Sequence, residues 1–427
     1  MVEKRSMKEF PKWQNRIFWT VWISYASYYL LRVNMSIAMP GIMSEFGISK
    51  TVMGGILSAF FIMYAVGQFV NGQLGDKFGA KKLITIGLTV SVLLNIAFGF
   101  TNGFLFGMII LWALNGFFQA TGWGPSVKTI ANWFHPSVRG KIGGRLGTSY
   151  QLGNAFSWAL SGFVVGMLGW RWAFWIPAII VTFVIINWIL KAKNAPEEAG
   201  FPTLEEAEKG VKESKTTKDH HLGFRYTLSK TLKNPTIWIV AFGLFFLNIV
   251  RYGFISWAPT YLFEIQGASM FSAAFKALMF PVAGSFGAVF AGWISDRGFG
   301  SRRAPIAVIM LLFLAVAAFL FPLVPTENWV LSLAVLMVVG FMTFGPHVMM
   351  VGVMAMDLGT RKAASSATGF IDGMGYVGAA FTGIASGFLI DAYGWNAAFN
   401  FWVLSAVVAA GLMALLWKYK PKKEKYH

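Results

Sequence analysis

Twelve runs of apolar residues, each long enough to cross a lipid bilayer, determine what this chain can fold into. A membrane-spanning helix needs about 20 predominantly apolar residues. Hydrophobic residues make up 56% of the chain and charged residues only 13%, which excludes an ordinary soluble protein. We therefore expect an all-α integral membrane protein with twelve transmembrane helices. The predicted spans are residues 17–43, 52–74, 83–100, 104–130, 142–168, 173–190, 237–263, 270–294, 304–324, 330–356, 363–390 and 397–417.

The basic residues are distributed unevenly between the two sets of loops that these spans define. The net charge is +18, and most Lys and Arg fall in the two tails and the even-numbered loops. Only Lys50, Arg171 and Lys276 fall in the opposite loops. Because loops rich in Lys and Arg stay in the cytoplasm, we expect a multi-pass protein of the plasma (inner) membrane with both termini cytoplasmic. The charge then reflects topology and contact with anionic membrane lipid, and we expect no nucleic-acid partner.

The sequence lacks the patterns that bind a cofactor or perform covalent chemistry. It has no cysteine, and it contains neither a phosphate-binding P-loop nor a cluster of metal-ligand residues. We therefore expect no cofactor, no metal site and no catalytic residue, and we do not expect an enzyme. The first apolar run is too long for a signal peptide and is expected to be the first span.

The chain divides into two halves with matching landmarks. A long polar stretch separates six spans from six, which predicts an N-terminal half at 1–190, a cytoplasmic linker at 191–235 and a C-terminal half at 236–427. The loop GQLGDKFGAKK after the second span matches GWISDRGFGSRR after the eighth. Two six-helix halves related by an axis along the membrane normal are typical of the major facilitator superfamily.

Both matching loops place an aspartate beside basic residues at a helix end. We expect Asp76, Lys77, Arg139, Asp296 and Arg297 to form charge clusters that hold the halves together in one state and release them in another. The alternative is that the basic residues only set the topology.

Arg32 and Arg251 lie in the middle of long uncharged stretches, at corresponding positions of the two halves. Placing a guanidinium in hydrocarbon costs about 3 kcal/mol on insertion scales, so an intramembrane arginine normally faces a polar cavity. Two arginines near one axis repel each other unless an anion lies between them. Because a guanidinium can hold phosphate oxygens with two donors at once, the pair predicts one site for an oxyanion; the alternative is a structural pair without a ligand.

Four stretches of the chain resemble the organophosphate:phosphate antiporters of the major facilitator superfamily, the group that includes glycerol-3-phosphate and hexose-6-phosphate transporters. They are YASYYLLRVN at 25–34, NGFFQATGWGP at 115–125, RYGFISWAPTYL at 251–262 and GP at 345–346. The resemblance implies that Arg32 and Arg251 bind the phosphoryl group and that Tyr25, Tyr28 and Tyr29 line the same cavity. It also implies exchange of an organic phosphate for inorganic phosphate.

The chain departs from the resembling transporters at several cavity positions. Glycerol-3-phosphate transporters have lysines where this chain has Val33 and Gln68, and a histidine where it has Tyr150, which precedes Gln151. Hexose-phosphate transporters resemble the chain in having an aspartate where it has Asp372, but with a lysine one turn later. We therefore include Tyr150, Gln151, Asp372 and Tyr376 among the candidate substrate contacts, and we expect Asp372 to select the non-phosphate part of the substrate.

Three alternatives remain at this stage. The alternative for the tyrosines is ordinary aromatic packing, which is their commoner use in spans. The protein could be a proton-coupled symporter of organic acids such as sugar acids, with Asp372 as its membrane carboxylate, or a sugar-phosphate receptor that does not transport. His347 is expected to be a polar residue lining the cavity, and Arg145, the nearest basic candidate to pair with Asp372, is expected to lie close to a gate. We expect a monomer.

Overall fold

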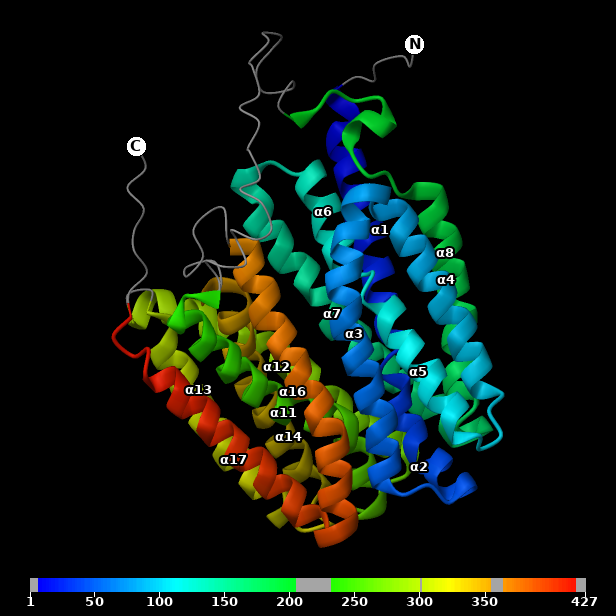
Figure 1. The fold of residues 1–427 in the computed structure, drawn as a ribbon, viewed down its shortest axis with the longest axis vertical. Helices are drawn as coiled ribbons and strands as arrows, with labels where there is room; N and C mark the ends of the chain where they lie inside the picture. The colour runs from blue at the N-terminus through cyan, green and yellow to red at the C-terminus, as the bar shows by residue number, and fades with distance from the viewer. Residues whose placement is uncertain (1–6, 205–231, 300–301, 355–363, 420–427) are drawn as a thin grey trace.

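The chain folds into two bundles of long helices (Figure 1). This computed structural model describes residues 7–204, 232–299, 302–354 and 364–419, and the regular structure within these ranges is helical. The first bundle contains α1 (Phe10–Leu30), α2 (Asn34–Phe46), α3 (Lys50–Phe78), α4 (Ala80–Gly99), α5 (Leu105–Gln119), α6 (Trp123–Trp133), α7 (Pro136–Leu168) and α8 (Trp172–Lys191). The second contains α11 (Pro235–Glu264), α12 (Met270–Gly298), α13 (Arg303–Leu320), α14 (Trp329–Val348), the π-helix η4 (Met349–Met354), α16 (Ala364–Tyr393) and α17 (Trp395–Ala414).

These helices account for the twelve predicted spans. The first predicted run is divided between α1 and α2, and the fourth is divided between α5 and α6. Ten segments of the described residues are long and apolar enough to cross a membrane. The two spans outside this set are the divided α1–α2 pair and α7, whose first half is rich in glycine, serine and charged residues. The α1–α2 pair and α7 therefore have low hydropathy because they carry polar residues inside the bundle.

The start of the predicted linker packs against the first bundle. Asn194 accepts a hydrogen bond of 2.8 Å from the backbone amide of Lys81 through its side chain, and its carbonyl accepts one of 3.0 Å from Asn132. Most of the predicted linker, residues 205–231, lies outside the described residues. The division of the chain at 191–235 stays a prediction.

The two bundles meet where α3 crosses α16 and where α7 crosses α12. Small residues allow the first crossing: a Cβ at Gly54 would overlap the carbonyl of Gly383, and a Cβ at Gly387 would overlap that of Lys50. Ser58 donates a hydrogen bond of 2.5 Å to the carbonyl of Ala380. Residues of this size let helix backbones approach closely in a membrane, where packing and interhelical hydrogen bonds stabilise association.

Polar contacts extend this meeting to the helix ends on one side of the molecule. Asp391 accepts hydrogen bonds of 2.6 Å from both the backbone amide and the hydroxyl of Thr51, in the first turn of α3. Lys50 lies 3.2 Å from the carboxylate of Glu264 at the end of α11. A carboxylate is stabilised at a helix N-terminus because the amides there are free. The side with the loops after spans one, seven and eleven is therefore closed.

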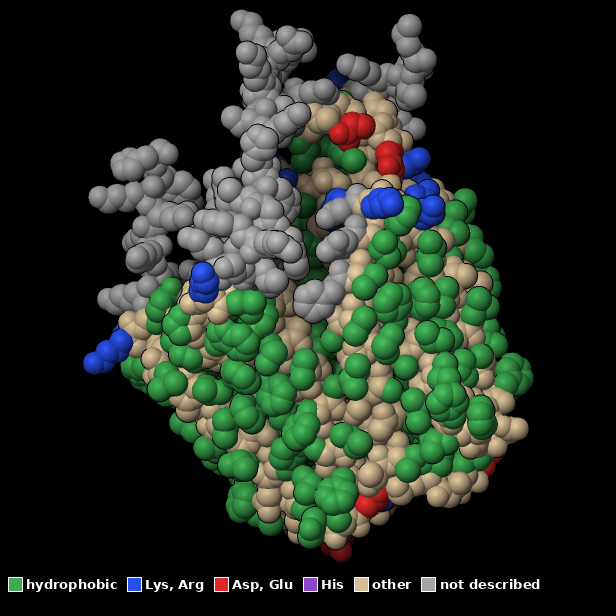
Figure 2. All heavy atoms as spheres, in the orientation of Figure 1, with side chains coloured by type: hydrophobic (Ala, Val, Ile, Leu, Met, Phe, Trp, Pro, Cys, Tyr) green, Lys and Arg blue, Asp and Glu red, His purple; other side chains and the backbone are tan. Residues whose placement is uncertain are grey.

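On the opposite side, glycines of α7 and α16 have open space beside them. Gly143 and Gly144 of α7 and Gly369 of α16 have no described heavy atom within 4 Å of the position that a Cβ would take. Figure 2 shows apolar side chains over the visible face of both bundles, with Lys and Arg of the described residues gathered toward the end where α1 begins. That distribution is typical of a membrane protein, while the cytoplasmic orientation of this end stays a prediction.

The predicted charge clusters are described only in part. The side chains of Asp76 and Asp296 lie outside the described residues. Arg139 donates hydrogen bonds to the carbonyls at the end of α6, at 2.9 Å to Phe134 and 2.7 Å to Ala131. Lys77 lies 5.4 Å from the ring centre of Phe78, and Arg297 lies 5.4 Å from that of Trp293. Arg139 thus caps a helix, and the latch stays a prediction.

Replacing Gly54 with Leu should weaken the contact between the bundles, because the new side chain would meet the backbone of Gly383. Overpacking of this kind typically lowers the free energy of unfolding by about 1–3 kcal/mol. Thermal unfolding of the purified protein measures the loss. The matched control is Gly55→Leu, since no described heavy atom lies within 4 Å of a Cβ at Gly55. Equal losses in both variants would contradict a stabilising role for the close crossing.

Candidate anion-binding site

The first span is interrupted at Arg32, between the end of α1 and the start of α2. The carbonyl of Leu31 accepts hydrogen bonds from Asn95 at 3.2 Å and Asn115 at 2.9 Å. Asn34 donates in turn to Asn95 at 3.0 Å. Irregular backbone is tolerated at membrane depth only where side chains, protein or water satisfy the released groups. Asparagines of α4 and α5 therefore fix the interruption and, with it, the place from which Arg32 projects.

Arg32 is buried in the first bundle, with 5% of its surface exposed. Its Nε donates to Oε1 of Gln119 at 3.3 Å. The guanidinium carbon lies 4.6 Å from the ring centre of Tyr64 and 4.8 Å from that of Tyr29, where the negative ring faces attract a cation. Its Nη1 and Nη2 are buried and have no hydrogen-bond partner among the described residues. Arg32 therefore keeps its terminal pair of donors free.

Arg251 is equally buried in the second bundle, also with 5% of its surface exposed. It lies in the continuous helix α11, and its Nη1 is 2.9 Å from Nε2 of His347. The guanidinium carbon lies 4.9 Å from the ring centre of Tyr252 and 5.0 Å from that of Phe344. Its Nε has no partner among the described residues. One donor of each arginine is thus held by its own bundle while others remain available.

No carboxylate of the described residues lies within salt-bridge distance of either arginine; the ion pairs Lys50–Glu264 and Arg171–Glu45 lie at helix ends. A buried charge without a partner is costly. Free guanidinium donors in this setting suit an anion with several oxygens, which can accept from two donors of one fork. The arrangement can therefore bind a multiply charged oxyanion.

Tyrosines from both bundles surround the two arginines. Tyr29 lies 6.1 Å from Tyr150 of α7, and Tyr25 lies 5.0 Å from Trp123, measured between ring centres. Tyr376 of α16 lies 4.4 Å from Tyr64 of α3. The structure thus brings the predicted Tyr25, Tyr29, Tyr150 and Tyr376 to one region.

Tyr28 is oriented differently from its neighbours. It is fully buried, and its hydroxyl forms a hydrogen bond of 2.8 Å with Thr121, in the interruption between α5 and α6. This contact ties the interruption of the fourth span to the first span. Gln151 is buried as well, and its Oε1 has no hydrogen-bond partner among the described residues.

Asp372 is half-buried on α16 and interacts electrostatically with both Arg251 and Arg32. The expected pairing with Arg145 is not found, because that exposed guanidinium lies over the ring of Phe18 at 4.8 Å. A Cβ at Gly375, one turn after Asp372, would lie only 2.6 Å from the side-chain nitrogen of Asn248. A larger residue there would therefore require the side chains of Asn248 and Leu244 to move.

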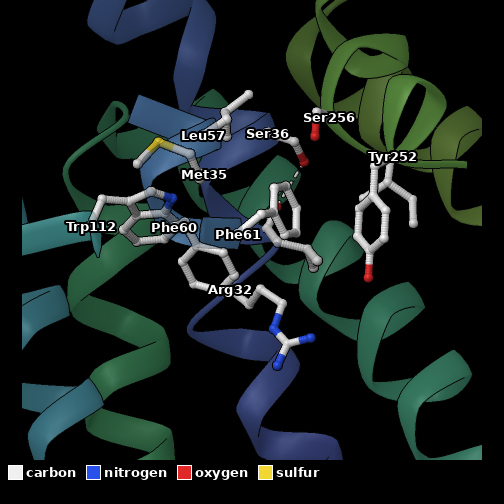
Figure 3. Close-up of a pocket in the computed structure, with 11 residues that line it drawn as sticks. Arg32, Met35, Ser36, Leu57, Phe60, Phe61, Trp112, Tyr252 and Ser256 are labelled. Carbon is white, nitrogen blue, oxygen red and sulfur yellow. Dashed lines mark hydrogen bonds between the residues drawn. The ribbon is translucent and has the colours of Figure 1, made fainter. Parts of the chain in front are cut away.

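A small cavity and an aromatic layer separate Arg32 from the closed side (Figure 3). The cavity has a volume of about 30 Å³, counted as the space that the centre of a water molecule can occupy. This volume can hold ordered water but not a phosphate ester. Phe61 of α3 meets Tyr252 of α11 at 4.6 Å between ring centres in an edge-on arrangement, and Figure 3 shows the two rings as neighbours. The site is thus sealed on this side by aromatic contacts between the bundles.

Sequence reasoning missed three residues at the site and gave a fourth too small a role. Tyr64, Tyr252 and Gln119 were not predicted, although Gln119 lies in a quoted motif and Tyr252 follows Arg251 directly. The position of a single tyrosine in a span does not show which residues of other helices it contacts. His347 was expected only to line the cavity, yet it contacts Arg251 directly.

Comparison with known proteins is consistent with this geometry. The sequence profile described as Major Facilitator Superfamily matches residues 21–383. A glycerol-3-phosphate transporter of Bacillus subtilis is 34% identical over 415 residues, covering 94% of this chain and 92% of the relative. A probable hexose phosphate transport protein of Chlamydia pneumoniae is 31% identical over 422 residues, covering 96% and 92%. The membrane sensor protein UhpC of Escherichia coli is 29% identical over 408 residues, covering 95% and 90%.

The fold has a solved counterpart. A bacterial homolog of the human lysosomal transporter Spinster superposes with a TM-score of 0.76 at 14% identity, covering 95% of this chain and 96% of that chain. At this identity the likeness shows the fold alone. With a profile match over most of its length, the chain belongs to the Major Facilitator Superfamily, and its relatives there are like the organophosphate:phosphate antiporters.

Proposed function

We propose that this membrane protein exchanges an organic phosphate of the sugar or glycerol type for inorganic phosphate by alternating access. The observation that carries the proposal is the pair of buried guanidinium groups, Arg32 and Arg251, one from each bundle, with donors left unpartnered. The names of the relatives from Bacillus subtilis and Chlamydia pneumoniae support a phosphate ester as substrate. We further propose a monomer with both termini in the cytoplasm.

The two arginines would also explain why exchange is obligatory. An empty site keeps two cations in one cavity, and their repulsion opposes the approach of the bundles on the open side. A bound oxyanion offsets this repulsion, so the loaded protein can close that side and open the other. With the predicted topology, the side that is closed by contacts between the bundles faces away from the cytoplasm. The phosphate gradient would supply the driving force.

The roles of the other site residues follow from their positions. Tyr25, Tyr29, Tyr150 and Tyr376 would line the path of the substrate, with Gln151 as a further polar contact. Tyr28 belongs to the same set in sequence, but its hydroxyl is occupied by Thr121. Its contribution would therefore be to hold the interrupted spans in place.

Replacing either arginine with lysine should abolish both binding and exchange. Lysine keeps the positive charge but loses the planar fork that can hold two oxygens at once. We expect inorganic phosphate to raise the unfolding temperature of the wild type but not of Arg32→Lys or Arg251→Lys. Phosphate exchange in proteoliposomes should fall at least about 100-fold, as for the loss of charge-assisted bonds worth about 3 kcal/mol. Normal exchange in Arg251→Lys would contradict a site built on both arginines.

The direction of energy coupling can be tested without a variant. Proteoliposomes preloaded with inorganic phosphate should accumulate labelled glycerol-3-phosphate or glucose-6-phosphate with no proton gradient, because exchange needs only the opposing phosphate gradient. Vesicles without internal phosphate are the control and should accumulate little. Uptake that requires a proton gradient and ignores internal phosphate would instead favour the organic-acid symporter.

A second candidate function is that of a receptor, which the similarity to the membrane sensor protein UhpC favours. A receptor would bind the phosphate ester through the same arginines. It would show phosphate-dependent thermal stabilisation without exchange in the vesicles described above.

Asp372 should influence which organic phosphate is preferred. Its carboxylate has no salt-bridge partner among the described residues and can accept hydrogen bonds from substrate hydroxyls or an amine. We expect Asp372→Asn to keep exchange of inorganic phosphate within about threefold of the wild type and to change the order of preference among organic phosphates, measured by competition. Complete loss of phosphate exchange in a folded Asp372→Asn protein would place the residue in the coupling mechanism.

A further inference from the structure

Each arginine of the site is held by one side chain from the fourth span of its own bundle. Gln119 is the last residue of α5, directly before the interruption of the fourth span, and it holds Nε of Arg32. His347 lies one residue before the end of α14, where the tenth span changes to the π-helix η4, and it holds Nη1 of Arg251. The two holders thus occupy similar places, where the helix departs from regular α geometry, but they differ in chemistry.

The contact between Arg251 and His347 determines the protonation state of the histidine. A guanidinium can only donate, so Nε2 of His347 must accept the hydrogen bond of 2.9 Å. The imidazole is then neutral and carries its proton on Nδ1, which is buried and has no partner among the described residues. A second proton would break this contact and place two cations side by side. The amide of Gln119 has no such dependence, because it does not titrate.

We infer that His347 is a positioning residue that holds Arg251 in the empty site and takes up a proton when a phosphoryl group binds. This inference rests on the proposed function. A dianion beside Arg251 supplies the negative charge that an imidazolium next to a guanidinium lacks, and it accepts hydrogen bonds from both. Anion binding is thereby linked to proton uptake in the second bundle and not in the first.

The groups around the pair allow His347 to be singled out. The ordinary pKa of tyrosine, about 10, lies above the range in which histidine titrates. Among the described residues of the site, Asp372 is the other ionisable group that could titrate there. The charged or titratable residues on the elements around α14 are Arg251 and Tyr252 (α11), Lys276 and Arg297 (α12), Arg303 (α13), Asp372 and Tyr376 (α16), and, across the cavity, Tyr29, Arg32 and Tyr150.

Linkage fixes the sign of the pH dependence. If the bound state holds one more proton than the empty state, affinity for phosphate rises as the pH falls, by at most about tenfold per pH unit. The ligand's own ionisation also changes with pH, but it affects every variant equally. The ratio of dissociation constants between a variant and the wild type therefore reports the protein's contribution alone.

The test compares the wild type with His347→Gln, which keeps an acceptor for Arg251 but cannot be protonated. The dissociation constant of inorganic phosphate is measured by calorimetry on the purified full-length protein at intervals from about pH 5 to about pH 8. We expect similar affinities at the upper end, and a ratio of variant to wild type that rises on the order of tenfold toward the lower end. His347→Ala, which leaves Arg251 without its holder, should bind more weakly at every pH.

Two further variants serve as controls. His135→Gln removes a histidine near the end of α6 and should keep the pH dependence of the wild type. Asp372→Asn combined with His347→Gln should show the same ratio to Asp372→Asn alone, which separates the two titratable groups. A ratio that stays within about twofold over the whole pH range would overturn the inference while leaving the proposed function intact. Failure of the wild type to bind phosphate at any pH would overturn the proposed function, and this inference with it.

Discussion

Two guanidinium groups are buried without a carboxylate partner among the described residues, and the structure around them must stabilise their charge. Arg32 and Arg251 are stabilised by aromatic ring faces and by one hydrogen-bonding side chain each. These contacts lower the cost of burial but do not neutralise the charge. Two guanidinium groups in this setting favour the proposed anion site. In that proposal, binding of the anion would link to movement of the bundles through its effect on these two charges.

Each arginine makes its side-chain hydrogen bond within its own bundle. Arg32 and Gln119 belong to the first bundle, and Arg251 and His347 belong to the second. Each half of the site can therefore move as a unit with its arginine already oriented. Such preorganisation matters because a fork that is displaced by a small distance no longer meets two oxygens at once.

Much of the fold could be predicted from hydropathy and from the repeat, because both depend on runs of many residues. The arginines were also predictable, since a charge in an apolar run has few explanations. The residues that hold the arginines in place could not be predicted from the sequence. Gln119 and His347 carry no charge that would make them conspicuous in an apolar span. Their contacts with the arginines depend on where the fourth and tenth spans depart from regular α-helical geometry. The missing lysine after Asp372 was visible in the sequence, but the packing of Gly375 against the side chain of Asn248 required the structure.

Contacts across the bundle boundary are of kinds that can separate at low cost. Around the site they are aromatic, as between Phe61 and Tyr252, so parting leaves no polar group unsatisfied. At the helix ends the bonds between Asp391 and Thr51 are exposed, and water can replace them. Ser58 bonds to the carbonyl of Ala380, an atom that also accepts from its own helix. The hydrogen bonds that hold the two arginines stay within bundles, which suits a rocking motion about a fixed central site.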